Sequence, residues 1–338
     1  MKKLWGFLTV LVVLVLGAYL FLRWEWGPYG LGGTVFIPRG SSVQKIGGIL
    51  TEHGIVRNTW SFKLLVRLEG AETQLKAGEY AFEGGIGARQ VLDKLRRGEI
   101  VVHYLTIPEG YNFAQIAKAI GQTGIATESE VLAAFRDPQY LSLLGFPVSS
   151  LEGYLFPATY PYDRGTELPE LLQAMIKSFL ANFDESMRAR MAQGNWTIPQ
   201  VTTLASIIEK ETGRADERPR IAAVFENRLK IGMPLQSDPT IIYGLENFDG
   251  NIRKKDIQNP HPYNTYVHPG LPPGPIASPG AESLKAVLYP AQSDELFFVA
   301  KGDGSHQFSE TLAEHQKAVE RYQLNKRGTT YPANPEAN

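Results

Sequence analysis

The residues TIPQVTTLASIIEKETG, Thr197–Gly213, form the stretch around which the second half of the chain is organised, and their pattern predicts one helix. Thr197 is a suitable N-cap, Pro199 suits the first turn, and Gly213 suits the position after a helix. At about 100° per residue, one face of this helix is apolar and must be buried. Its members are Val201, Leu204, Ala205, Ile208 and Thr212.

Two glutamates lie on opposite edges of this apolar face. By the same rotation Glu209 and Glu211 are roughly 160° apart, so they cannot serve one site as a pair. The neighbours of Glu209 are small, which leaves room for a ligand, whereas Glu211 lies beside large aliphatic residues. A carboxyl group at the edge of an apolar face tends to have a raised pKa, which suits a general acid near neutral pH. Taken alone, the helix favours the alternative in which both glutamates are ordinary solvated edge residues.

Composition bounds the class of protein. The chain has 338 residues, a length sufficient for two or three domains with a sizeable core. Of these residues 43% are hydrophobic and 20% are charged, as in a globular protein. Its net charge is −1, and −4 without Lys2, Lys3 and Arg23, so no nucleic-acid partner is expected. The chain contains no cysteine, which excludes disulfides, thiol catalysis and cysteine-ligated zinc.

Residues Leu4–Leu22 form an uncharged segment of 19 residues that predicts a transmembrane helix. At about 1.5 Å per residue it spans roughly 28 Å, close to the hydrocarbon thickness of a bilayer. Lys2 and Lys3 precede it, so the positive-inside rule places the N-terminus in the cytoplasm and the chain after Arg23 on the far side. The alternative is a cleaved signal peptide, whose apolar region would be shorter and end in small residues, unlike Tyr19–Leu22.

An internal repeat with an offset of 70 residues relates Thr34–Ile55 to Tyr104–Ile125. Each copy predicts a short strand, a Pro-x-Gly turn, a helix of about three turns and a Gly-Ile exit. The pattern resembles the LysM module, a small extracytoplasmic binder of N-acetylglucosamine polymers. A recurring structural unit without a ligand is the alternative. The matched residues are Ile37, Pro38, Gly40, Ile46, Gly54 and Ile55 in the first copy and Ile107, Pro108, Gly110, Ile116, Gly124 and Ile125 in the second.

We therefore predict an α+β protein with an N-terminal transmembrane helix, a LysM-like small α+β subdomain and a larger mixed α/β catalytic domain. The stretch GPYGLGG, Gly27–Gly33, predicts a flexible spacer after the anchor. The two repeat units are expected to pack together, and a linker at Gly145–Ser150 is expected to separate the domains. The predicted bounds are 1–23 for the cytoplasmic tip and anchor, 34–125 for the α+β region, 150–324 for the catalytic domain and 325–338 for a disordered tail.

Several polar residues downstream of the central helix are candidates for a binding groove. The dipeptide Asp238-Pro239 suits a helix start with Asp238 as N-cap, which is an ordinary structural role. Gln236 has no such local role and is available to a ligand. Tyr263, Asn264 and Tyr266 are residues of the kind that line a sugar groove, by ring stacking and amide hydrogen bonds.

The histidines give little sign of a metal site. His261 and His268 lack the helical i, i+4 spacing of a zinc pair, and the chain contains no HExxH motif. We therefore predict neither a metal nor a cofactor. His306, in the turn GDGSHQF, is predicted to be structural rather than catalytic.

A series of motifs occurs along the chain in a fixed order and, with the N-terminal anchor, resembles the YceG-like family of endolytic murein transglycosylases. The resemblance covers nearly the whole chain after the anchor. The motifs are LEGYLFPATY, LASIIEKET, ENRLKIGMPLQSDPTIIYG, YNTY, GLPPGPIASPG and FFVAKGDGSHQFS.

This resemblance implies a lyase of cell wall biogenesis, held in the inner (cytoplasmic) membrane of a bacterium by one helix, that cuts within peptidoglycan glycan strands. It implies peptidoglycan synthases as partners and a LysM-like subdomain before the catalytic domain. It also implies that the catalytic glutamate is the first in the Glu-Lys-Glu-Thr motif, which is Glu209. The substrate-binding residues expected from its motifs are Asn227, Gln236, Asp238, Tyr263, Asn264 and Tyr266.

The mechanism that the resemblance implies needs one carboxyl group, whereas an ordinary glycosidase needs two. Glu209 would protonate the glycosidic oxygen, and the C6 hydroxyl of N-acetylmuramic acid would then attack C1 to give a 1,6-anhydro end. This requires Glu209 to be protonated at rest through burial. A hydrolase with Asp238 or Glu211 as second carboxylate is the competing enzyme. A glycan-binding scaffold in which Glu209 is structural is the alternative without catalysis.

Overall fold

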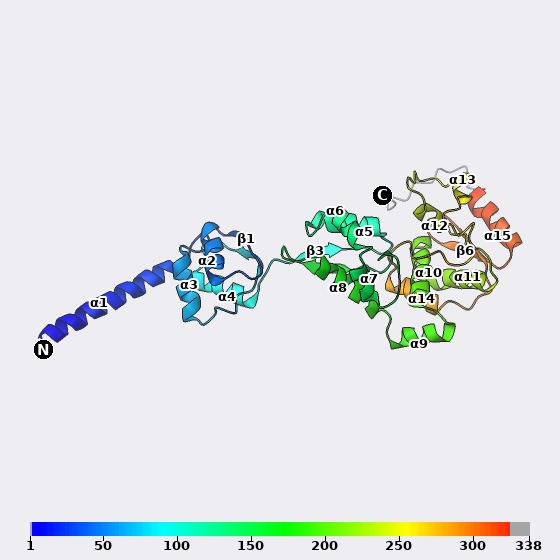
Figure 1. Cartoon of the computed structure of the whole chain (residues 1–338). Helices are drawn as coiled ribbons and strands as arrows, with labels where there is room; N and C mark the ends of the chain where they lie inside the picture. The colour runs from blue at the N-terminus through cyan, green and yellow to red at the C-terminus, as the bar shows by residue number, and fades with distance from the viewer. Residues whose placement is uncertain (1, 325–338) are drawn as a thin grey trace. The chain divides into compact units, whose positions relative to one another are not determined.

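A computed structural model describes residues 2–324 of the chain and divides it into two compact units. The first comprises residues 1–105 and 160–167, and the second comprises 106–159 and 168–338. The predicted tail at 325–338 lies outside the described residues. The structure is a mixed α+β protein with one apolar N-terminal helix, as the sequence predicted (Figure 1).

The elements follow the order of the chain in both units. From the N-terminus, the first elements are α1 (Lys2–Glu25), β1 (Gly33–Ile37), α2 (Val43–Glu52), α3 (Thr59–Leu68), β2 (Gly78–Phe82), α4 (Ala88–Arg97) and β3 (His103–Thr106). There follow α5 (Phe113–Thr123), α6 (Glu128–Ala134), α7 (Pro138–Leu141), η1 (Ser142–Leu144), β4 (Thr159–Tyr162), α8 (Leu168–Ala181) and α9 (Glu185–Gly194). The last are α10 (Ile198–Glu211), α11 (Arg218–Lys230), α12 (Asp238–Tyr243), α13 (Lys254–Ile257), α14 (Ala281–Leu288), β5 (Phe297–Ala300), β6 (His306–Ser309), α15 (Leu312–Val319) and η2 (Glu320–Leu324).

The first unit is built on the antiparallel pair β1–β2, in which Val35 lies opposite Tyr80. Alternate residues of both strands face a core to which α2, α3 and α4 contribute their apolar sides. Gly98 ends helix α4 with a φ of 73°, in the left-handed region that favours glycine. The local rules of capping and periodicity therefore account for this unit well.

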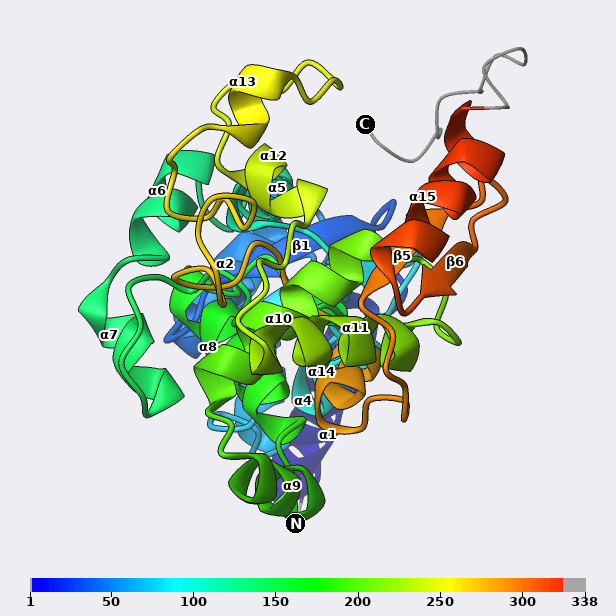
Figure 2. The same cartoon turned by 90° about the vertical axis from the view of Figure 1, so that its right-hand side faces the viewer.

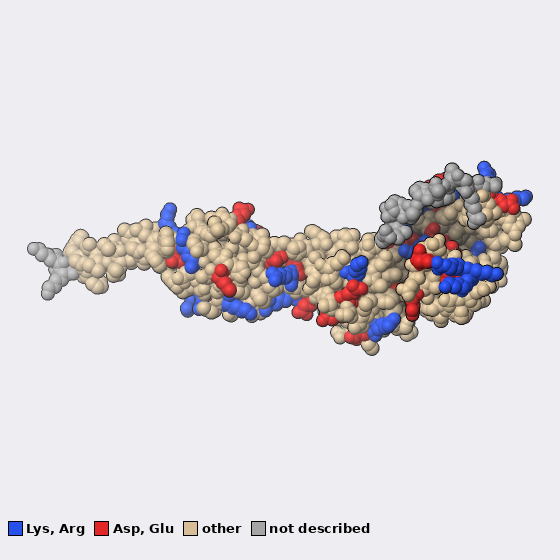
Figure 3. Space-filling model, turned by 90° about the horizontal axis from the view of Figure 1, so that it is seen from above, with Lys and Arg blue, Asp and Glu red and all other residues tan. Residues whose placement is uncertain are grey.

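Helix α1 is long and apolar enough to cross a membrane, and the described residues Leu4–Glu25 form the qualifying span. Its visible face carries no charged side chain over most of its length in Figure 3. Its C-terminal end is bound to α3: Trp26 Nε1 donates to the backbone oxygen of Ser61 at 2.9 Å, and the hydroxyl of Ser61 donates to Glu25 at 2.9 Å. The rings of Phe21 and Trp60 stack with centroids 6.0 Å apart. Helix α1 is thus joined to the rest of the first unit by packing as well as by the chain.

The stretch Gly27–Gly33 is not the flexible spacer that its glycines predicted. The backbone nitrogen of Tyr29 donates to Ile86 at 3.1 Å, and that of Gly85 donates to Gly30 at 2.9 Å. A Cβ at Gly30 would lie 2.1 Å from the backbone oxygen of Gly54. Glycine is required here for close backbone approach rather than for mobility.

The two repeat copies have the predicted local structure but different surroundings. Gly40 and Gly110 both adopt positive φ in the turn, and Ser42 and Asn112 cap the helices that follow. The helix of the first copy, α2, belongs to the first unit, and that of the second, α5, belongs to the second. The predicted 34–125 region is therefore divided between the two units. Helix α5 packs on α6, which follows that region in the chain.

Helix α10 is the centre of the second unit. Its predicted N-cap is confirmed: Thr197 and Gln200 form a capping box, and Pro199 lies in the first turn. Eight consecutive residues from Val201 to Ile208 are buried, so the helix is enclosed on all sides rather than on one face. Its neighbours are α11, α12 and α14 (Figure 1).

The antiparallel hairpin β5–β6 lies beside these helices and carries α15 on its other side, as Figure 2 shows. Phe298 points to α11, where its ring meets Phe225 edge-on at 5.7 Å. Phe297 points to α15, where its ring stacks on His315 at 5.2 Å. Side chains of a strand alternate between its faces, so the hairpin joins α11 to α15.

Candidate active site

A pocket of about 460 Å³ lies in the second unit at the C-terminal end of α10. Residues from α10, α11, the segment before and within α12, the β5–β6 hairpin and the C-terminal helices line it. Its size is in the range of small-molecule and sugar sites. Its polar residues are Glu211, Arg228, Gln236, Asp238, Tyr266, His306, His315 and Gln323.

Glu211 is the last residue of α10 and lines this pocket. Its carboxyl group is buried among protein atoms. Burial, assisted by the charge of Asp238, raises the pKa of Glu211 to about 7. The hydroxyl of Ser237, which donates to Glu211 Oε1 at 2.5 Å, and the charge of Arg228 oppose that shift. A carboxyl group that is about half protonated at neutral pH is suited to donate a proton.

Arg228 lines the pocket, and hydrogen bonds to two backbone oxygens hold its side chain in place. Its Nε donates to the backbone oxygen of Leu296 at 2.7 Å and its Nη1 to that of Leu235 at 2.6 Å. Burial lowers the pKa of Arg228, and its guanidinium carbon lies 5.4 Å from the ring centre of Phe297. These contacts fix a cation close to the Glu211 carboxyl group without forming a direct ion pair among the described residues.

Asp238 does not have the N-cap role that the sequence predicted. Ser237 occupies the N-cap position of α12, while Asp238 accepts a hydrogen bond from the hydroxyl of Tyr266 at 2.6 Å. Burial and the Asp238 contact raise the pKa of Tyr266, which keeps its hydroxyl protonated as a donor. Asp238 is thereby held at the pocket as a second carboxylate.

Gln236 lines the same pocket and has a strained backbone. Its φ is +51°, in the left-handed region that residues other than glycine rarely adopt. Its nitrogen donates to the backbone oxygen of Thr265 at 3.1 Å, which ties this conformation to the segment that carries Tyr266. Strain of this kind is concentrated at functional sites.

Glu209, the catalytic residue expected from the sequence, does not line this pocket. Its Oε1 accepts from Arg218 at 3.1 Å, and its Oε2 accepts from the backbone nitrogen of Gly280 at 3.0 Å and from Ser283 at 2.7 Å. Its side chain is 6% exposed, so the start of α14 and Arg218 fill the space predicted for a ligand. Three donors, one of them the cationic Arg218, therefore occupy the carboxylate oxygens of Glu209.

Three of the expected groove residues also lie outside this pocket. The side-chain nitrogen of Asn227 donates to the backbone oxygens of Ser293 and Glu295, which holds the segment before β5. Asn264 is buried, and its side-chain nitrogen donates to three backbone oxygens between residues 256 and 259. Tyr263 packs against Tyr243, with ring centres 4.8 Å apart.

Tyr263 belongs to a second buried carboxyl site, at Glu152. Burial raises the pKa of Glu152 to about 7. Glu152 accepts from the backbone nitrogen of Phe113 and, at 3.1 Å, from the hydroxyl of Tyr243. It thereby joins the start of α5 to the end of α12, the helix that carries Asp238 at its other end.

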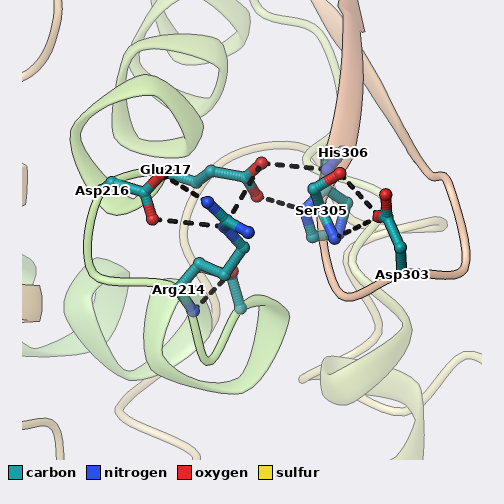
Figure 4. A network of polar contacts seen from close by, with 7 residues as sticks. Arg214, Asp216, Glu217, Asp303, Ser305 and His306 are labelled. Carbon is teal, nitrogen blue, oxygen red and sulfur yellow. Dashed lines mark hydrogen bonds and ion pairs between the residues drawn. The ribbon is translucent and has the colours of Figure 1, made fainter.

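A polar network reaches the pocket from the loop between α10 and α11 (Figure 4). Nδ1 of His306 lies 2.7 Å from Oε2 of Glu217, and the backbone nitrogen of His306 donates to Oε1 of Glu217 at 3.0 Å. Arg214 pairs with Asp216 at 2.8 Å and lies 4.0 Å from Glu217. Asp303 accepts from the amide and hydroxyl of Ser305 and so shapes the turn before β6.

The structure therefore brings Gln236, Asp238 and Tyr266 together with Glu211, and it places Glu209 elsewhere. The motifs FFVAKGDGSHQFS and ENRLK contain further pocket residues that sequence reasoning did not assign: Arg228, Phe297, Phe298 and His306. An arginine on the apolar side of an otherwise amphipathic helix was the one local signal for Arg228.

Comparisons with known proteins agree with the motifs. The model of the YceG-like family matches residues 35–321. The chain is 37% identical over 302 residues to the endolytic murein transglycosylase of Bacillus subtilis, covering 85% of this chain and 83% of that protein. It is 34% identical over 318 residues to the endolytic murein transglycosylase of Streptococcus pneumoniae strain D39, covering 85% of this chain but 57% of the pneumococcal protein.

A solved structure is similar as well. The crystal structure of a YceG-like protein from Listeria monocytogenes has a TM-score of 0.60 and 34% sequence identity to this chain. The similarity covers 85% of this chain and 98% of that one.

Proposed function

The chain belongs to the YceG-like family, as its motifs predicted, and we propose that it is an endolytic peptidoglycan lytic transglycosylase with Glu211 as its catalytic acid. The relatives named endolytic murein transglycosylase support the reaction. One structural observation supports the residue: Glu211 combines a raised pKa with a place in the pocket, and Glu209 has no place there.

In the proposed mechanism, the protonated carboxyl group of Glu211 gives its proton to the glycosidic oxygen between N-acetylmuramic acid and N-acetylglucosamine. The bond from C1 to that oxygen breaks while the C6 hydroxyl of the same muramic acid attacks C1. The carboxylate of Glu211 then takes the hydroxyl proton, so the acid is restored and a 1,6-anhydro end forms without water. The cation of Arg228 stabilises the carboxylate between the two proton transfers.

A hydrolase is the second candidate, because Asp238 supplies another carboxylate in the pocket. In a retaining or inverting hydrolase, Asp238 would act on C1 or on a water while Glu211 protonates the leaving oxygen. The products separate the two reactions, since a hydrolase consumes water and leaves reducing ends.

Mass spectrometry of the fragments that the protein releases from purified peptidoglycan tests the proposal. We expect the full chain in detergent to release fragments with 1,6-anhydromuramyl ends that arise inside strands. Reducing muramic acid ends would make the protein a hydrolase with Asp238 as second carboxylate. Binding of glycan strands without any cleavage would favour the scaffold alternative.

The pH dependence of cleavage should follow the protonation of Glu211. Because the acid must carry a proton and its pKa is raised to about 7, we expect kcat/KM to fall roughly tenfold per unit above about pH 7. A rate that stays constant to pH 9 would exclude Glu211 as the acid.

The fall in kcat/KM at high pH must be distinguished from a loss of activity caused by unfolding. Glu211 and Glu152 have raised pKa values, so their contribution to stability is fully present below the usual value of 4.5 and is lost as pH rises through about 7. Thermal unfolding measured at each pH is therefore the control.

We also propose that α1 anchors the protein in the bacterial cytoplasmic membrane, with both units outside the cytoplasm. Its length and apolar composition support this, and the Trp26–Ser61 and Phe21–Trp60 contacts keep the rest of the first unit next to the anchor. The order β1–α2–α3–β2 supports a single LysM-like module that binds glycan. Peptidoglycan synthases, which make the nascent strands, remain the proposed partners.

A further inference from the structure

A second functional group faces the Glu211 pocket: His306, the first residue of β6. The carboxylate of Glu217 contacts two atoms of this histidine. Its Oε2 contacts the ring Nδ1, and its Oε1 accepts a hydrogen bond from the backbone nitrogen (Figure 4). The side chains of His306 and Glu217 are only 10% and 12% exposed. The ring cannot turn without breaking a buried contact, so its orientation is set before any ligand arrives.

The contact with Glu217 also decides which ring nitrogen carries the proton. An ionised carboxylate can only accept a hydrogen bond, so the proton of the neutral ring lies on Nδ1. The lone pair then lies on Nε2, which makes this atom an acceptor. Among residues 2–324, Nε2 has no hydrogen-bond partner, and the ring lines the pocket.

The surroundings of His306 hold it firmly in place. In the hairpin register Ala300 lies opposite His306, and the ring of Phe298 meets the imidazole edge-on at 5.5 Å. Nε of Arg214 lies 4.0 Å from Oε1 of Glu217. A histidine with one nitrogen fixed by a carboxylate and the other facing a pocket is arranged as a functional group rather than as a packing residue.

We propose that His306 contacts the substrate, and that its Nε2 accepts a hydrogen bond from a hydroxyl group of the glycan strand bound in the Glu211 pocket. Glu217 is the positioning residue that fixes the tautomer and the ring. This inference rests on the proposed function, because a glycan is the ligand that supplies hydroxyl donors at this site. It assigns to the GDGSHQF turn a binding role in place of the structural one predicted from the sequence.

Two substitutions of similar size separate a substrate contact from a structural role. In His306→Asn, the amide nitrogen lies near the former Nδ1 and keeps the hydrogen bond to Glu217, but nothing replaces Nε2. In His306→Gln, the amide lies near the former Nε2 and can still meet a sugar hydroxyl. We expect kcat/KM for anhydromuramyl ends to fall roughly tenfold in His306→Asn and to stay within about threefold in His306→Gln, with KM carrying much of the loss.

The opposite ranking, with full activity in His306→Asn and a large loss in His306→Gln, would show that the residue acts only through Glu217. Equal activity of both variants and the wild type would also overturn the inference. Thermal unfolding of each variant shows whether a loss reflects the fold. If the wild type makes no anhydromuramyl ends, the proposed function itself fails, whereas an active wild type with an active His306→Asn refutes only the role of His306.

Discussion

Replacing Glu211 by glutamine is expected to abolish cleavage while leaving the protein folded. Glutamine has nearly the same shape and can accept the hydrogen bond of Ser237, but it has no proton to give at the glycosidic oxygen. General acid–base catalysis contributes roughly 10²–10⁴-fold, so the rate of formation of anhydromuramyl ends should fall by about that factor. Fragment analysis by mass spectrometry measures the loss, and thermal unfolding verifies that the variant is folded.

Glu209→Gln is the matched control, since it makes the same chemical change two residues away on the same helix. The amide oxygen of the glutamine can take the place of Oε2 and still accept from Gly280 and Ser283, so the surroundings of Glu211 are preserved. We expect this variant to keep activity within about tenfold of the wild type, with lower stability because the ion pair with Arg218 is lost. Loss of cleavage in Glu209→Gln together with full cleavage in Glu211→Gln would restore Glu209 as the acid.

Replacing Arg218 by methionine is expected to cause the largest loss of stability. Arg218 and Glu209 are 9% and 6% exposed in their side chains, so the substitution leaves a buried carboxylate without its cation. Breaking one side of such a pair costs about 3–5 kcal/mol in the free energy of unfolding. Denaturant unfolding of the full chain, followed by circular dichroism, measures this change.

The control for Arg218 is Arg214→Met, which removes an exposed arginine that pairs with the exposed Asp216 in the preceding turn. Exposed ion pairs contribute little, so its unfolding should resemble that of the wild type. The double variant Arg218→Met/Glu209→Gln should recover part of the lost stability, because the buried charge is removed with its partner. Equal stability of Arg218→Met and wild type would mean that the Glu209 cluster does not hold α10 against α14.

Local rules predicted many elements with their ends. Helix α10 has its predicted N-cap at Thr197 and Pro199 in its first turn, and both repeat copies have the predicted turn followed by a helix. Such features depend on residues within one or two turns of each other, through capping groups and the 3.6-residue period. The apolar segment Leu4–Leu22 likewise predicted a helix by length and hydropathy alone.

Other expectations failed because the deciding contacts come from far along the chain. The glycines of Gly27–Gly33 suggested mobility, but the turn at Gly85 and the exit at Gly54 pack on them. Asp238 had an ordinary local role available as N-cap, but Tyr266 binds it and Ser237 takes the cap position. A preference for a turn or cap is a small energy that tertiary contacts override.

The sequence by itself determined that the Thr197–Gly213 stretch is a buried helix, that its two glutamates point to opposite edges, and that the chain carries the motifs of the YceG-like family. Only the tertiary structure decided which edge is open. Residues some 70 positions later, at the start of α14, close the edge of Glu209, whereas the α12 segment and the hairpin leave a pocket beside Glu211. Helical periodicity gives the direction of a side chain relative to its own helix, but access and desolvation depend on what packs against that edge.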